Sequence, residues 1–412
     1  MNVLHISTAD QLGGSARSAW KIHTGLRALG ATSRMLVRIR DSADPDVAAI
    51  SHGALKLADR AANKLTGMLG LQYCYFPSTA LLHRHRWFRE ADVVQCYNLH
   101  GGYFSFRALP RLSRLKPLVW RLSDMWPMTG HCSFPGDCER WRTGCGQCPD
   151  LPQYPGLPFD TSALLFRLKQ GAYARSRLHI VAPSSWIGEQ AQRSPLLGQF
   201  PLHTIPNGID PAVFTPRDRA ACRRELGIPT DRFMVLVLAH DFRRGTRKGL
   251  EFALDHVWQS PDMQERQAGL MLVGQGAATA EPGLPGLVWR HDLVSDDRRL
   301  ATIYAAADLY LHPAVFENLP NTIIEAMACG TPAVAFDTGG VKDVVHHRRT
   351  GYLARYRDGS DLLAGVLGAI AAPAELAAWR QAGLELIAAR FTHQAQAAAF
   401  LALYQELAGS HG

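Results

Sequence analysis

The 412-residue sequence contains no run of about 18 apolar residues, so no transmembrane helix is expected. Residues 1–6 carry neither a basic segment nor a long apolar core, so we expect no signal peptide and a cytoplasmic location. Low-complexity tracts and internal repeats are also lacking. With 47% hydrophobic and 19% charged residues, the chain is expected to fold as a globular protein of about two domains.

Acidic residues are scarce in the first half. Residues 1–205 hold 24 basic and 13 acidic side chains, whereas the remainder holds 20 and 23, so the net charge of +8 arises entirely from the first half. A basic half favours an anionic partner, such as a phosphorylated substrate or a membrane surface, although a solvated basic surface explains the charge equally well. Nucleic acid is not expected as a partner, because no nucleic-acid-binding motif is present.

Short apolar runs alternate with helical patterns along the whole chain. Such alternation predicts βαβ units and parallel sheets, and nearly continuous apolar runs suit strands that are covered on both faces. The predicted strands are 3–7, 33–39, 92–97, 117–122, 179–182, 202–205, 233–239, 269–273, 287–289, 309–312 and 333–336. A breaker-rich join at 206–211 divides them into two groups. The predicted fold class is therefore α/β, with two doubly wound domains in tandem and ligands at the carboxyl ends of the strands.

Residues 313–332 form the strongest motif, Pro-Ala-Val-Phe-Glu-Asn-Leu-Pro-Asn-Thr-Ile-Ile-Glu-Ala-Met-Ala-Cys-Gly-Thr-Pro. The pattern predicts that a strand ends near 312, that a loop carries Glu317, and that a helix with Asn318 or Leu319 as cap follows and carries Glu325 one turn in. A helix start with free amides suits a diphosphate, and carboxylates at that position accept hydrogen bonds from sugar hydroxyls. The same pattern also fits a plain strand–loop–helix unit whose Glu residues complement the helix dipole.

With this motif the chain resembles the retaining glycosyltransferases of family 4, and residues 123–132 resemble the exopolysaccharide-type (colanic-acid-like) members. Gly13-Gly14-Ser15, the interdomain segment 206–210, the basic motif 247–249 and the glycine pair in 337–340 match the family in the same order. The resemblance implies a GT-B fold, which is two Rossmann-like domains facing across a cleft. It also implies an acceptor-side domain at 1–206 with a Cys-rich loop at 131–149, a nucleotide-sugar domain at 207–390, and a last helix at 391–412 that packs back on the first domain.

The resemblance also implies roles for individual residues. Glu325 should bind the nucleotide ribose and Glu317 the hydroxyls of the transferred sugar, while Lys248 with Arg243 or Arg244 should hold the diphosphate. The candidate donor-binding residues are Gly13, Gly14, Arg243, Arg244, Lys248, Glu317, Asn318, Leu319, Asn321 and Glu325. Because fixed cations stabilise the leaving diphosphate, no catalytic metal is expected. The single Asp-x-Asp sequence, Asp44-Pro45-Asp46, is interpreted as a surface loop.

The chain departs from the family at one position. Many members have Leu-His-Asp after the strand that is predicted here at 117–122, whereas this chain has Leu122-Ser123-Asp124. Ser123 could replace the missing His, or His100 or His131 could supply an imidazole, while Asp124 stays in register. The candidate catalytic residues are Lys248, Glu317, Asp124 and His100.

Four of the eight cysteines cluster as Cys132, Cys138, Cys145 and Cys148. The Cys-x2-Cys pair is a common half of a tetrahedral zinc site, so the cluster predicts a structural zinc, with free thiols and a disulfide as alternatives. Zinc held by four Cys ligands leaves no open position for catalysis.

Residues 51–90 combine aliphatic and aromatic residues with basic ones. This composition suits the surface of a membrane, although helices packed on the first sheet with solvated basic faces would give the same composition. The predicted function is transfer of a sugar from a nucleotide-sugar to a glycan acceptor, expected to be linked to a polyprenyl diphosphate, in exopolysaccharide or cell-surface polysaccharide biosynthesis. The enzyme is expected to be peripheral on the inner face of the cytoplasmic membrane. The alternative is a non-catalytic nucleotide-sugar or glycan-binding protein on the same scaffold.

Overall fold

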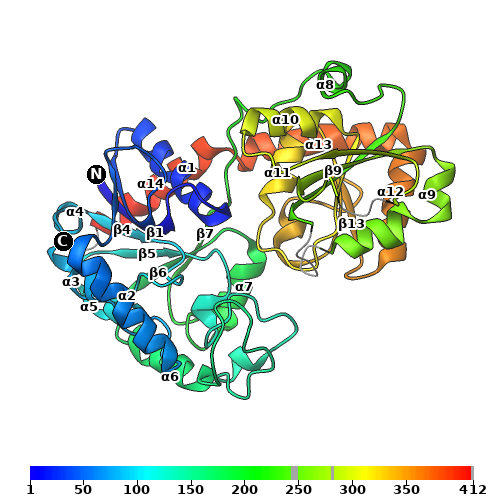
Figure 1. Cartoon of the computed structure of the whole chain (residues 1–412). Coiled ribbons are helices and arrows are strands. Elements are labelled where there is room, and N and C mark those ends of the chain that lie inside the picture. Colours follow the sequence, from blue (N-terminus) through cyan, green and yellow to red (C-terminus); the bar gives the residue numbers. More distant parts are fainter. Residues whose placement is uncertain (243–248, 280–282, 410–412) are drawn as a thin grey trace. The chain divides into compact units, whose positions relative to one another are not determined.

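The structure is a computed structural model that describes residues 1–242, 249–279 and 283–409 (Figure 1). Arg243, Arg244 and Lys248, three of the predicted diphosphate ligands, lie outside the described residues. Across the described ranges, no single helix has both the length and the apolar composition to cross a membrane. Two consecutive helices, Gly359–Ala371 and Pro373–Arg390, reach that length and composition only when they are counted together, and the chain bends by 102° between them. The chain divides into two compact units, residues 1–206 with 393–412, and residues 207–392.

The first unit is built on a parallel sheet of seven described strands. Their order is β3 (Val47–Ala49), β2 (Thr32–Ile39), β1 (Asn2–Ala9), β4 (Val93–Cys96), β5 (Leu118–Arg121), β6 (Leu178–Ala182) and β7 (Leu202–Thr204). The helices are α1 (Gly14–Ala28), α2 (Gly53–Met68), α3 (Pro77–Leu81), α4 (Arg86–Glu90), α5 (Leu109–Leu115), α6 (Ser162–Tyr173), α7 (Ser185–Arg193) and α14 (His393–Gly409). Figure 1 shows α14, from the far end of the chain, beside α1. The two helices approach so closely that a Cβ on Gly25 would lie 2.7 Å from the Cβ of Ala397.

The second unit repeats this architecture with a parallel sheet of six described strands. Their order is β10 (Leu287–His291), β9 (Gly269–Gln275), β8 (Met234–Asp241), β11 (Leu309–His312), β12 (Ala333–Phe336) and β13 (Gly351–Ala354). The helices are α8 (Arg219–Leu226), the π-type η6 (Phe252–Trp258), α9 (Pro261–Glu265), α10 (Asp297–Ala306), α11 (Asn321–Ala328), α12 (Gly359–Ala371) and α13 (Pro373–Arg390). Two hydrophobic clusters draw on alternate residues of the same strands, so both faces of this sheet are buried.

The predicted α/β class with two doubly wound domains is confirmed, because every described strand pair in both sheets is parallel. The strands β3 and β13 were not predicted. Both are short edge strands with mixed burial, so neither stands out as an apolar run. The expected cap of α11 is also corrected, since Pro320 rather than Asn318 or Leu319 occupies the N-cap position and no side chain caps the helix.

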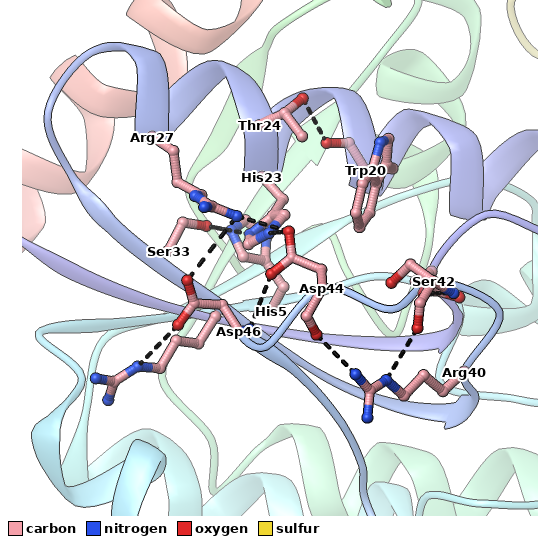
Figure 2. A network of polar contacts seen from close by, with 12 residues as sticks. His5, Trp20, His23, Thr24, Arg27, Ser33, Arg40, Ser42, Asp44 and Asp46 are labelled. Carbon is pink, nitrogen blue, oxygen red and sulfur yellow. Dashed lines mark hydrogen bonds and ion pairs between the residues drawn. The ribbon is translucent and has the colours of Figure 1, made fainter.

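Asp44-Pro45-Asp46 forms part of the loop between β2 and β3, as the sequence predicts for a surface loop. Asp44 accepts a hydrogen bond from Arg27 at 2.7 Å, and Asp46 lies 3.7 Å from Arg34. Figure 2 shows both carboxylates turned toward Arg27. The two Asp residues therefore bind α1 and β2 to the loop.

Two fully buried histidines lie beneath that loop. His5 Nε2 and His23 Nδ1 both contact Ser33 Oγ at 2.8 Å, and Asp44 lies 4.0 Å from His23 Nε2 (Figure 2). Burial lowers the pKa of His23 to about 4, against an opposing effect of Asp44, and burial lowers that of His5 well below its ordinary value. Both imidazoles are therefore neutral in the folded protein near pH 7.

This burial predicts acid sensitivity of the first unit. His23 protonates near pH 6.5 when unfolded but near pH 4 when folded, so its contribution to stability is complete above pH 6.5 and is lost as the pH falls toward 4. The loss from His23 alone is about 3 kcal/mol. Chemical denaturation at several pH values should show that His23→Gln removes the share of this decline that His23 contributes. The other histidines of this unit whose pKa is lowered by burial, which are His5, His85, His131 and His203, should keep their shares. Parallel pH profiles of variant and wild type would contradict the assignment.

Candidate functional site

Three neighbouring strands of the first unit end beside one another, and the loops that follow them carry the predicted residues. β1 leads to Gly13 and Gly14, β4 to His100, and β5 to Asp124. Because β4 lies between β1 and β5 and all three are parallel, their carboxyl ends meet at one edge of the sheet. The structure therefore places these residues at the edge where α/β sheets bind ligands.

The glycine loop is tied to this edge by Ser15. Helix α1 begins at Gly14 with Gly13, at φ +90°, as its N-cap, so Ser15 lies inside the helix and does not cap it. Instead, Ser15 Oγ donates to Asn98 Oδ1 at 3.2 Å and lies 2.8 Å from Ser123 Oγ. Ser123, at the position of the family's missing His, thus joins a hydroxyl and amide cluster after β1, β4 and β5.

His100 and Asp124, predicted separately, form one pair. His100 Nε2 lies 2.7 Å from Asp124 Oδ2, and Asp124 Oδ1 accepts the amide of Trp126 at 2.9 Å. The His100 ring lies 5.6 Å from the rings of Trp126 and Tyr154, and its side chain is 6% exposed against 20% for Asp124. The carboxylate is thus the partner that a ligand can reach, and the buried imidazole holds it in place.

The turn behind Asp124 is anchored by Lys169 of α6. Its Nζ donates to the carbonyls of Trp126 at 2.7 Å and Thr129 at 2.9 Å, and lies 3.6 Å from the centre of the Trp126 ring. Burial lowers the pKa of Lys169 to about 7. Sequence reasoning missed this residue, because a single Lys in an amphipathic helix gives no signal of burial.

The four clustered cysteines line one small cavity and are free thiols. Cys145 Sγ accepts the amide of Gly130 at 3.2 Å, and Cys148 Sγ lies 3.2 Å from Nε2 of the buried His131. Burial raises the pKa of Cys132 to about 12, and burial also raises that of Cys145 and Cys148.

The structural zinc expected at these cysteines stays a prediction. Within the described ranges, no group of three or more His, Cys, Asp or Glu side chains is placed so that it could hold a metal ion. Hydrogen bonds also constrain this loop. Cys148 N donates to Asp160 at 2.8 Å, Gly146 N to Ser162 at 3.0 Å, and His131 Nδ1 lies 2.9 Å from the carbonyl of Pro155.

In the second unit, Glu317 lies in the loop that follows β11. Its Oε2 is 3.8 Å from His312 Nε2, and His312 Nδ1 is 3.0 Å from the hydroxyl of Tyr310. The loop after β12 fixes the Glu317 backbone, since Gly340 N donates to its carbonyl at 3.3 Å and a Cβ on Gly339 would lie 1.7 Å from that oxygen. Glu317 is therefore held on both sides, at the carboxyl edge of the sheet.

Glu325 projects from the second turn of α11 and is half-buried. Tyr304 of α10 donates from its hydroxyl to Glu325 Oε2 at 3.2 Å. At the start of the helix, Asn321 Oδ1 accepts from Asn207 at 2.7 Å, and Asn318 is half-buried. The side chain of Leu319 is part of the hydrophobic core, so it can offer a ligand only its backbone.

Gly249, the described residue of the basic motif 247–249, lies at the same edge of the sheet. Gly249 has φ +60°, and a Cβ there would lie 1.9 Å from the carbonyl of Pro313, the residue after β11. The chain that follows the predicted diphosphate ligands is thus packed against the end of the strand that leads to Glu317.

The family model described as Glycosyl transferases group 1 matches residues 234–372, a range that contains both Glu317 and Glu325. This part of the chain is a group 1 glycosyltransferase domain. Transferases of this group generally need no catalytic metal. The matched range runs from the start of β8 to the end of α12, so all six described strands of the second sheet lie within it.

Individual proteins similar to the chain are also glycosyltransferases by name. The putative colanic acid biosynthesis glycosyl transferase WcaC of Escherichia coli (strain K12) is 26% identical over 265 residues, which cover 61% of this chain and 62% of that protein, so this match spans only part of the relative's length. A D-inositol 3-phosphate glycosyltransferase of Xylanimonas cellulosilytica is 27% identical over 98% of this chain and 95% of that protein.

Among solved structures, HepE of Anabaena in complex with UDP superimposes with a TM-score of 0.67 at 18% identity, over 99% of this chain and 100% of that chain. At this identity the likeness shows the fold, which is GT-B, as for the other glycosyltransferase neighbours. The GT-B fold predicted from the resemblance is therefore confirmed, and the range that matches the group 1 model lies within the second unit.

Several polar residues beside the predicted ones were missed by the sequence analysis. Asn98 and His312 each stand where a strand ends, so strand-end position was a usable signal for both. Tyr304 lies within a helix, is fully buried and donates a hydrogen bond to Glu325. The sequence pattern does not distinguish it from an ordinary core residue.

Proposed function

We propose that the protein is a retaining glycosyltransferase that moves a sugar from a nucleotide-sugar to a lipid-linked glycan acceptor in cell-surface polysaccharide biosynthesis. The observation that carries the proposal is the pair Glu317 and Glu325, held by defined contacts after β11 and on α11 of a group 1 domain. Two comparisons support the substrate classes: WcaC is named for colanic acid biosynthesis, and HepE has been solved with UDP-glucose.

In this proposal each candidate residue binds a different part of the substrates. Glu325 accepts hydrogen bonds from the ribose, and Glu317 accepts them from hydroxyls of the transferred sugar. Arg243 or Arg244, with Lys248, neutralises the diphosphate as its charge grows in the transition state, which is where a fixed cation lowers the barrier. The backbone of Gly13 and Gly14 lets a substrate approach closely.

The reaction exchanges one bond at the anomeric carbon for another on the same face. The bond from that carbon to the diphosphate oxygen breaks, the acceptor hydroxyl oxygen forms the new bond, and the hydroxyl proton passes to the leaving phosphate oxygen. The leaving group therefore serves as base, and no protein carboxylate needs to take the proton. Because a lipid-linked acceptor has its diphosphate at the bilayer surface, we place the enzyme at the inner face of the cytoplasmic membrane.

The test is release of nucleoside diphosphate by the purified chain. UDP- and GDP-sugars are each incubated with and without a polyprenyl-linked lipid extract, and both the free nucleotide and the lipid-extractable label are measured. We expect one donor to be consumed, faster with lipid, and Glu317→Gln to lower turnover roughly a hundredfold. A protein that binds a donor but never releases its nucleotide would be the non-catalytic binding protein instead.

Asp124 should act as a substrate-binding group that His100 positions. With Asp124→Asn we expect turnover to fall roughly 10–100-fold, because a charged acceptor is lost while the Lys169 anchor keeps the turn in place. His100→Ala should have a smaller effect, and His100→Gln, which keeps a donor, should restore part of it. Equal turnover of Asp124→Asn and wild type at unchanged melting temperature would contradict this role.

A further inference from the structure

Helix α2 of the first unit is exposed on a face that would ordinarily be buried. Of its 16 residues, all described, Asp59 alone is buried, whereas Leu57, Leu65 and Met68 are 65%, 61% and 67% exposed. These three share one face with the exposed Ala61, since their spacing follows the helical repeat. The opposite face of α2 carries Asp59 and packs against the first unit, where Asp59 contacts the start of α3. Large apolar residues gathered on an outward face mark a surface that contacts another phase or molecule.

The charges of α2 lie beside this apolar row. Lys56, Arg60 and Lys64 recur every four residues and are exposed, and their side chains form no hydrogen bond or ion pair with any described residue. The one acidic residue of the helix cannot balance them, because Asp59 is turned inward and accepts the amide of Ser78 at the start of α3. The outward half of α2 is therefore apolar and basic, with no acidic group.

One neighbouring basic residue differs in this respect. Arg86 on α4 pairs with Glu90 at 2.6 Å, and Glu90 also pairs with Arg34. Arg84 and Arg89 are exposed, so the cationic surface of 51–90 extends beyond α2, which carries three of its exposed basic residues.

We infer that α2 lies flat on an anionic lipid bilayer, with Leu57, Leu65 and Met68 entering the boundary of the acyl chains and the three basic residues contacting lipid phosphates. A helix of this length extends about 24 Å along the surface. Charge complementarity favours an anionic bilayer over an apolar protein groove, because three exposed cations border the apolar row and residues 1–205 hold 11 more basic than acidic residues. The inference rests on the proposed function in one respect, which is that an enzyme with a lipid-linked acceptor must bind the membrane surface where that acceptor lies.

The test is sedimentation of the full chain with vesicles, in the absence of donor and acceptor. We expect binding to phosphatidylcholine mixed with phosphatidylglycerol, weakened by salt, and little binding to phosphatidylcholine alone. The triple variant Lys56→Gln, Arg60→Gln, Lys64→Gln should partition roughly a hundredfold less, from about 1 kcal/mol per residue. The triple variant Leu57→Gln, Leu65→Gln, Met68→Gln should also lose binding at unchanged charge.

A matched control removes three other exposed basic residues, as Arg193→Gln, Arg224→Gln and Arg266→Gln, and should bind vesicles nearly as wild type does. Wild-type binding by both α2 variants, equal binding to neutral vesicles, or self-association through α2 without lipid would each overturn the inference. Nucleotide release from the donor is measured on the same α2 variants without vesicles. Failure of that assay alone removes the proposed function, whereas failure of vesicle binding alone removes the membrane surface.

Discussion

Replacing Gly339 by alanine is expected to lower sugar transfer by roughly a hundredfold or more while the second unit stays folded. Gly339 has φ +54°, and its Cβ would lie 1.7 Å from the carbonyl oxygen of Glu317, an overlap that the backbone must relieve by moving. Because a displacement of about 1 Å at a reacting centre can cost about 10²-fold, the substitution tests whether Glu317 is positioned by the loop after β12.

The matched control for this substitution is Gly368→Ala in α12. That glycine is helical, nothing lies within 4 Å of its ideal Cβ, and alanine there should add about 0.5–1 kcal/mol of stability without changing turnover. Both proteins are compared by kcat/KM for the donor that the wild type uses, with melting temperature as the folding check. If Gly339→Ala transfers sugar at the wild-type rate, Glu317 is not the positioned group that the proposal requires.

Loss of Asp308 should produce the largest stability effect in the second unit. Asp308 directly precedes β11 and accepts hydrogen bonds from Arg223 of α8, from Arg219 at 2.9 Å and from the amide of Met234 at 2.7 Å. Arg223 is 4% exposed, so Asp308→Ala leaves a guanidinium buried without its counter-charge. Breaking a buried pair in this way costs about 3–5 kcal/mol. Because β11 leads to Glu317, sugar transfer should be lost at temperatures where the variant unfolds.

An exposed ion pair of the same unit provides the comparison. Arg299 and Glu225 lie 2.8 Å apart with side chains 35% and 57% exposed. Solvent screens this pair, so Glu225→Gln should change the free energy of unfolding by less than about 1 kcal/mol. Denaturant titration of both variants measures the contrast, and equal destabilisation by Asp308→Ala and Glu225→Gln would show that burial does not strengthen the Asp308 cluster.

The strands of the fold could be predicted because both sheets are covered on both faces. Strands such as β9 and β12 are short apolar runs, and their positions follow from sequence alone. β3 and β13 are edge strands of mixed burial, so the same signal is absent. Ser15 has the chemistry of a helix cap, but its hydroxyl contacts Asn98 and Ser123, residues that are distant in sequence and that no local pattern predicts.

The candidate site was predictable to the extent that it depends on strand ends. Parallel strands bring their carboxyl ends to one edge, so His100 and Asp124 were identified from sequence, whereas their pairing required coordinates. Lys169 and Tyr304 reach the clusters from helices whose composition looks like ordinary core and surface, and only tertiary packing reveals them. The cysteine spacing suggested a metal, but spacing cannot indicate that hydrogen bonds to Asp160 and Ser162 already hold the loop.

We propose that Glu325 and Glu317 bind two different parts of one nucleotide-sugar. Equilibrium titration tests this assignment most directly. The chain is titrated with the nucleotide-sugar that it consumes and with the corresponding nucleoside diphosphate. We expect Glu325→Gln to weaken both ligands roughly tenfold or more, through the ribose, and Glu317→Gln to weaken the nucleotide-sugar but not the nucleoside diphosphate. Wild-type affinity of both variants for both ligands would contradict the account.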